Sequence, residues 1–202
     1  MKFLFLCFAL TSAVWGQDAL VDKPGPDVAP SAVKAVADLG KQVVMGKYLA
    51  AVDKMYPQWK ERTAARMGGM AKLEAQLQGV AKQMLQQGIS IIEFTPVGQP
   101  TVHEVGMGKT VVQENGQQVE KMRYTKWLVL VPTSTKFRAM VDGKPEPILI
   151  ESTGFQVAIA DKNKLDWTFI DGASVTVHDL RSLFVNLPVD LALPPLEKRQ
   201  IK

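Results

Sequence analysis

Two acids and a phenol are the residues of this chain best suited to proton transfer. Glu93 lies on a predicted strand, and Asp171 directly follows the last predicted strand. Tyr124 lies on a predicted hairpin strand between them in the chain. A buried carboxyl group with a raised pKa beside a phenol can act as a general acid or base. The simpler interpretation makes Asp171 a turn residue before Gly172, Glu93 an outward strand residue and Tyr124 a core aromatic. We therefore keep these three as catalytic candidates only.

Other catalytic and metal-binding patterns are missing from the sequence. The two histidines, His103 and His178, have no partners at ligand spacing, so neither metal nor cofactor is predicted. Because adjacent strand residues point to opposite faces, His103 and Glu104 cannot converge on one atom. No serine-hydrolase elbow occurs, and no glycine-rich phosphate loop opens a helix. The only cysteine, Cys7, lies in the apolar leader.

Three aromatic residues are candidates for a ligand-binding wall. Trp59 falls near a predicted helix break, and Tyr124 and Trp127 lie on one predicted strand. Such rings can stack on a flat or sugar-like ligand, or they can simply fill the core. The core interpretation is favoured for Trp127, and Trp59 is left open.

The elements that must position these residues begin with helices. Apolar residues at three- and four-residue spacing predict a first helix over 33–55, with Ser31 as its cap. Pro57 then separates it from a second helix over 58–87, for which Gly88 is a suitable end. The pair Gly68 and Gly69 predicts a kink in that second helix.

Beyond residue 88 the apolar period changes to two, which predicts an antiparallel sheet. The turn pair Asn115 and Gly116 predicts a hairpin, and Pro132 is expected to close the strand that follows it. A short last helix is predicted over 178–184, with Thr176 and Asp179 at its start. The predicted strands span 89–95, 101–114, 119–131, 135–141, 148–152, 155–160 and 165–170. Because Pro145 and Pro147 make 148–152 an edge or a bulge, we count about five or six strands. Helices followed by such a curved antiparallel sheet predict a single cone-like α+β domain over 33–188.

The two ends of the chain differ in composition from the predicted domain. Lys2 and the apolar run over 3–15 are typical of a secretory signal peptide spanning 1–16, with cleavage near Gly16. The run is too short to span a bilayer, so we expect an exported protein, periplasmic or secreted, whose mature chain has no membrane span. Proline-rich residues 17–32 predict an extended linker, and 189–202 predict a proline-rich, basic tail. The net charge of +4 is too small, and too evenly interleaved with acids, to indicate a nucleic-acid partner.

The order of elements resembles the nuclear-transport-factor-two-like and cystatin-like superfamily. The segment LDWTFIDGASVTVHDLRSLFVNL at 165–187, a strand W-x-F-I-D-G before a short helix, is similar to exported bacterial members without an assigned function. The resemblance implies a curved sheet that wraps N-terminal helices and forms a pocket. Members of the superfamily range from isomerases and dehydratases to non-catalytic binding modules, so the resemblance implies no particular reaction.

These observations leave three functions open. The leading hypothesis is a non-catalytic binding or accessory domain of the cell envelope, holding a small apolar ligand or a protein partner on the concave sheet face. The first alternative is a small isomerase- or dehydratase-like enzyme that uses an acid in that cavity. The second alternative is a structural homodimer paired through the sheet.

Overall fold

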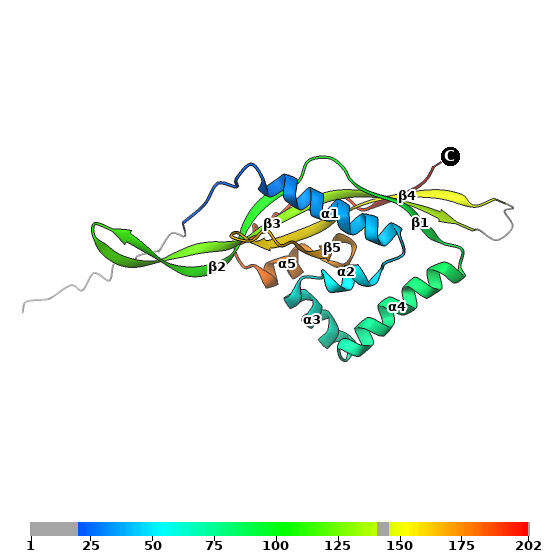
Figure 1. The fold of residues 1–202 in the computed structure, drawn as a ribbon, viewed down its shortest axis with the longest axis horizontal. Coiled ribbons are helices and arrows are strands. Elements are labelled where there is room, and N and C mark those ends of the chain that lie inside the picture. Colours follow the sequence, from blue (N-terminus) through cyan, green and yellow to red (C-terminus); the bar gives the residue numbers. More distant parts are fainter. Residues whose placement is uncertain (1–19, 141–145, 202) are drawn as a thin grey trace, which may run out of the picture.

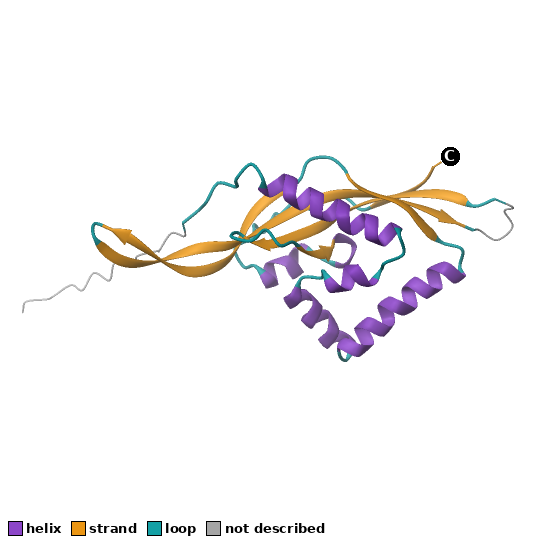
Figure 2. Cartoon of the chain, viewed as in Figure 1, coloured by secondary structure: helices purple, strands orange, loops and turns teal. Residues whose placement is uncertain are grey.

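The computed structural model describes residues 20–140 and 146–201 (Figure 1). The predicted signal peptide, its cleavage site near Gly16 and the turn expected at Asp142 and Gly143 lie outside these residues. Within them the chain is an α+β fold with five α-helices and one six-stranded antiparallel sheet, as the sequence predicts. Figure 2 shows the helices gathered around one part of the sheet, with strands running past them at both ends.

Two long strands form the middle of the sheet, and the shorter strands pair along their outer edges. Strand β3 pairs with β1 along one half and with β2 along the other, while β4 pairs in the same way with β6 and β5. The strands are β1 (Ser90–Pro96), β2 (Thr101–Glu114), β3 (Gln117–Ala139), β4 (Ile148–Asp161), β5 (Thr168–Asp171) and β6 (Glu197–Ile201).

Strand β3 runs through Pro132, so the expectation that this proline closes a strand is wrong. Pro132 lies opposite Phe155 of β4, and its carbonyl accepts a hydrogen bond from the backbone N–H of Val97. Val97 belongs to the connection between β1 and β2. The missing N–H of the proline therefore faces the gap where one neighbouring strand replaces the other, and no ladder bond is lost there. Strand β4 likewise joins the two short strands predicted over 148–152 and 155–160.

The turn at Asn115 and Gly116 is confirmed. Both residues have positive φ, 51° and 80°, and they form a two-residue loop between the paired residues Glu114 and Gln117. This is the conformation that Asn-Gly favours. Between this turn and Val105, β2 and β3 pair with each other and extend beyond the rest of the sheet as a two-stranded arm (Figure 1).

Four helices precede the sheet where two were expected. They are α1 (Val28–Val44), α2 (Leu49–Asp53), α3 (Pro57–Met67) and α4 (Met70–Gln86). The helix expected over 33–55 breaks after Val44, and Gly46 in the break has a φ of 79°. The kink expected at Gly68 and Gly69 is a complete break, because their φ values of 83° and 123° lie outside the helical region. The chain therefore reverses direction between α3 and α4, and these helices form an open V below the sheet (Figure 1).

The sheet has an apolar core on each face. One face, which includes Trp127 and Val129, is covered by α1. The opposite face, which includes Leu128 and Leu130, is covered by Trp59 of α3, by α5 (Val177–Leu183) and by the chain that follows α5. Helix α5 starts with the expected capping box, in which Thr176 and Asp179 hydrogen-bond to each other's backbone N–H groups. Because successive side chains of β3 point to opposite faces of the sheet, this strand contributes residues to both cores.

The segments flanking the predicted domain are more ordered than the sequence suggested. Helix α1 begins at Val28, five residues before its expected start, and Leu20 forms a bridge to Arg123 on β3. In the tail, Leu191 is buried and Leu193 packs on the core, and residues 197–201 form strand β6 against β4. Within the described ranges, no helix has both the length and the apolar character needed to cross a bilayer.

Candidate functional site

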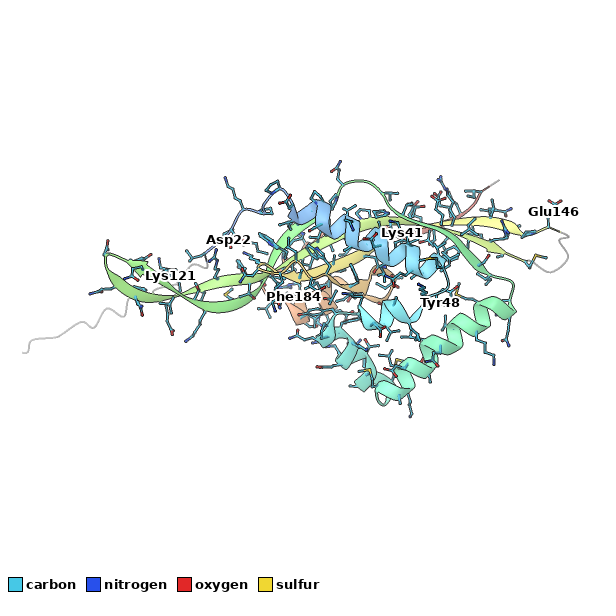
Figure 3. The ribbon with its side chains drawn as sticks, viewed as in Figure 1. Asp22, Lys41, Tyr48, Lys121, Glu146 and Phe184 are labelled. Atoms are coloured by element: carbon cyan, nitrogen blue, oxygen red, sulfur yellow. The ribbon has the colours of Figure 1, made fainter. Side chains whose placement is uncertain are left out.

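A cavity of about 400 Å³ lies between the helices and the α1-covered face of the sheet. Every helix before the sheet contributes to its wall, and Tyr48 at the start of α2 lies in the region enclosed by α1 and α4 (Figure 3). Most wall residues are apolar. They are Leu39, Gly40 and Val43 of α1; Ala51 and Val52 of α2; Met55; Trp59 of α3; Leu77, Val80 and Met84 of α4; Ile91 and Phe94 of β1; Phe137 of β3; and Phe169 of β5.

A close approach of α1 to β1 shapes one side of the cavity. A Cβ atom built on Gly40 would overlap the ring of Phe94, so this helix position has room for glycine only unless the ring moves. Helix α4 forms the opposite side. It packs on α2 and α3, and Val80 remains 47% exposed although it lines the cavity, so the cavity opens along this helix.

The polar part of the wall gathers around Asp171, at the end of β5. The Asp171 carboxylate accepts a hydrogen bond from Gln156 Nε2 at 3.2 Å, and it also accepts one from the backbone N–H of Ala173. Ser174 donates to the Asp171 backbone carbonyl at 2.8 Å, and its side chain lines the cavity with that of Thr135. Asp171 is exposed by its surface area, but neighbouring protein atoms partly displace water from its carboxylate, and this partial desolvation raises the pKa of Asp171.

A second hollow of about 480 Å³ adjoins the cavity along the sheet. The two share Phe94, Thr135, Phe137, Gln156 and Asp171 in their walls. Away from this boundary, polar residues of β3, β4 and β6 contribute much of the wall of the second hollow. These are Thr133, Ser152, Thr153, Glu197 and Lys198. We call it the polar groove; Asp171 lies where the apolar cavity meets it.

The three proton-transfer candidates do not come together. Glu93 pairs with Lys136 across β1 and β3, with their charged atoms 2.7 Å apart, and this contact raises the pKa of Lys136. A bulge at Ile92 turns Glu93 to the face opposite Phe94, and so away from the cavity. Tyr124 lies on the two-stranded arm, opposite Met107. Twelve residues of β3 separate it from Lys136, which is about 40 Å at 3.3 Å per residue.

Of the three aromatic candidates, one reaches the cavity. Trp59 is 4% exposed, packs in the core and also lines the cavity, and the guanidinium of Arg66 lies 5.8 Å from its ring. Trp127 is buried in the core under α1, where Lys162 Nζ lies 4.4 Å from its ring. The favoured interpretation of Trp127 as a core residue is confirmed. Tyr124 lies on the arm and is part of neither the cavity wall nor the buried core clusters.

His103 lies on β2 and is partly buried. Burial lowers the pKa of His103, and its Nε2 atom has no hydrogen-bond partner among the described residues. Its strand partner is the core residue Leu128. In the part of the chain that the structure describes, no three His, Cys, Asp or Glu side chains gather where they could hold a metal ion.

Sequence reasoning missed most of the cavity wall. Gly40 lay on the predicted apolar stripe of α1, and a glycine among larger apolar residues was the one available signal of a close approach. Phe94 and Phe137 become neighbours on the cavity side only through the pairing of β1 with β3. Gln156 meets Asp171 through the register of β4 against β5, which no local pattern encodes.

No family model matches the chain, and no curated protein or solved structure matches it either. The site is therefore interpreted from its own geometry.

Proposed function

We propose that this chain is an exported, non-catalytic binding protein that holds a small, mostly apolar molecule in the cavity between α1, α2, α4 and the sheet. The cavity itself carries the proposal. Its volume of about 400 Å³ is in the range of ligand pockets, its wall is mostly apolar, and most of its polar residues gather around Asp171. This combination binds a ligand body by burial and orients it by a few hydrogen bonds.

The placement of the sequence candidates supports binding over catalysis. The isomerase- or dehydratase-like alternative works through an acid together with a second of the three proton-transfer candidates. Asp171 reaches the cavity, but Glu93 is paired with Lys136 and Tyr124 lies on the arm. The proposed kinship with the nuclear-transport-factor-two-like and cystatin-like superfamily rests on the element order, helices before an antiparallel sheet. Export rests on the leader sequence.

The test fills the cavity and measures the binding of a neutral apolar fluorophore, N-phenyl-1-naphthylamine. Ala51→Trp places an indole in the cavity wall and is expected to weaken binding by about tenfold or more. Ala75→Trp is the matched control, because Ala75 is exposed on α4 and lies outside the cavity wall. It should bind as the unmodified protein does.

Thermal unfolding of both variants shows whether they fold. If Ala51→Trp fails to fold, Val80→Trp replaces it, since Val80 lies at the exposed mouth of the cavity. Native mass spectrometry of the protein purified from its own envelope then identifies any retained molecule. Equal fluorophore binding by the cavity-filled variant and the unmodified protein would overturn the proposal.

A further inference from the structure

The charged groups around the cavity are few and unevenly placed. Asp171 is the one charged side chain in the described wall of the apolar cavity. In the polar groove, Glu197 and Lys198 are added to it. The two spaces together therefore carry two acids and one base. Asp171, at their boundary, is the charged group that a molecule in the cavity would contact.

Asp171 is held in place without a cation beside it. Gln156 Nε2 and the backbone N–H of Ala173 donate to its carboxylate, and these neutral donors fix its orientation. Within the described residues, no Lys, Arg or His nitrogen lies within ion-pair distance of Asp171, although most acids on the sheet have such a partner. A carboxylate partly removed from water gains most from a cation supplied from outside.

The one base in the groove is placed away from the boundary. Lys198 lies opposite Ser152 on β4, and Asp171 lies opposite Gln156, four residues further along the same strand. That separation is about 13 Å at 3.3 Å per residue. If the head group of an amphiphilic ligand bound Lys198, the apolar part of that ligand would therefore lie outside the cavity. If the head group bound Asp171, the apolar part would lie inside it.

We propose that the ligand is a lipophilic amine, whose ammonium group pairs with Asp171 and whose apolar body fills the cavity. The inference rests on the proposed function, since it names the chemical class that the same cavity takes. Gln156 is a positioning residue here, because it orients the carboxylate. An anionic amphiphile of the same length would bring its own carboxylate against Asp171 and bind less well.

The test uses three ligands with the same ten-carbon chain: n-decylamine, n-decanol and n-decanoate. Each competes with the neutral fluorophore N-phenyl-1-naphthylamine at pH 7 and low salt. The amine is expected to compete at about tenfold lower concentration than the alcohol, and decanoate more weakly than either. Asp171→Asn should abolish the difference between amine and alcohol, which is measured as the ratio of their competing concentrations within the one variant.

Two further variants make the result specific. Glu197→Gln removes one acid from the groove away from the boundary and should keep the preference for the amine. Ser174→Lys places an ammonium beside Asp171 and should remove that preference even if Asp171→Asn does not fold. Equal competition by amine and alcohol in the unmodified protein, or an amine preference that survives both Asp171→Asn and Ser174→Lys, would overturn the inference. Failure of the proposed function is distinguishable, because then the fluorophore itself would not bind in the cavity.

Discussion

Asp22 ties the segment before α1 to the sheet through contacts with two strands and the turn after β4. Its carboxylate accepts hydrogen bonds from Arg123 Nη2 at 2.9 Å and from Lys162 Nζ at 2.7 Å, and its backbone N–H donates to Glu104. Lys162 also pairs with Glu104 and lies over the Trp127 ring. These contacts, led by the hydrogen bond from Arg123, lower the pKa of Asp22 to about 2. Its ionised form therefore stabilises the fold.

Asp22→Asn is expected to lower the free energy of unfolding by about 1 kcal/mol at pH 7, because partial exposure screens the ion pairs. The unfolded-state pKa is about 3.9 and the folded value is lower, so the contribution is complete above about pH 5 and is lost as the pH falls toward 2. Urea unfolding at pH 7, 4 and 2.5 measures how the difference in the free energy of unfolding between Asp22→Asn and the unmodified protein decreases with pH. Asp166→Asn, which removes one exposed pair with Lys54, should have little effect. A difference that does not change with pH would contradict this assignment.

At the scale of elements, α1 and α4 each contain an interior glycine, but only the glycine of α1 lies against a side chain of another element. Gly40 on α1 faces the Phe94 ring, whereas a Cβ atom at Gly79 on α4 would meet nothing within 4 Å. Alanine at Gly79 should therefore stabilise its helix by about 1 kcal/mol. Alanine at Gly40 should destabilise the protein by about 1 kcal/mol despite the same helix gain, because Phe94 must move into the cavity. Urea unfolding compares the two, and a more stable Gly40→Ala protein would show that this contact is loose.

The elements that could be predicted from the sequence are those fixed by neighbouring residues. The turn at Asn115 and Gly116 and the capping box of Thr176 and Asp179 are local, and both are confirmed. The continuity of β3 through Pro132 depends on where β1 gives way to β2, which no local pattern shows. The candidate site follows the same rule. Asp171 could be named from its type and its place at a strand end, but its neighbours depend on strand register.

At the scale of the whole molecule, both faces of the sheet are already covered, one by α1 and the other by α3, α5 and the chain after α5. The end of the sheet beyond them carries a row of charges that includes Glu93, Lys136 and Glu151. Large apolar side chains exposed in the described ranges come from several parts of the chain, such as Met107 on β2 and Val185 and Val189 after α5. A homodimer paired through the sheet would therefore have no apolar sheet face to bury.

We accordingly expect a monomer of unusual shape. Light scattering coupled to size-exclusion chromatography should give a mass no greater than the 22.2 kDa of the full chain, but elution should be early for that mass. The reason is the arm, whose Lys121 lies at the opposite end of the molecule from Glu146 (Figure 3). Shortening the arm by deleting residues 111–120 and joining the paired residues Thr110 and Lys121 with Asn-Gly should delay elution without changing the number of subunits. A dimeric mass that becomes monomeric after this deletion would instead make the arm an interface between copies of the chain.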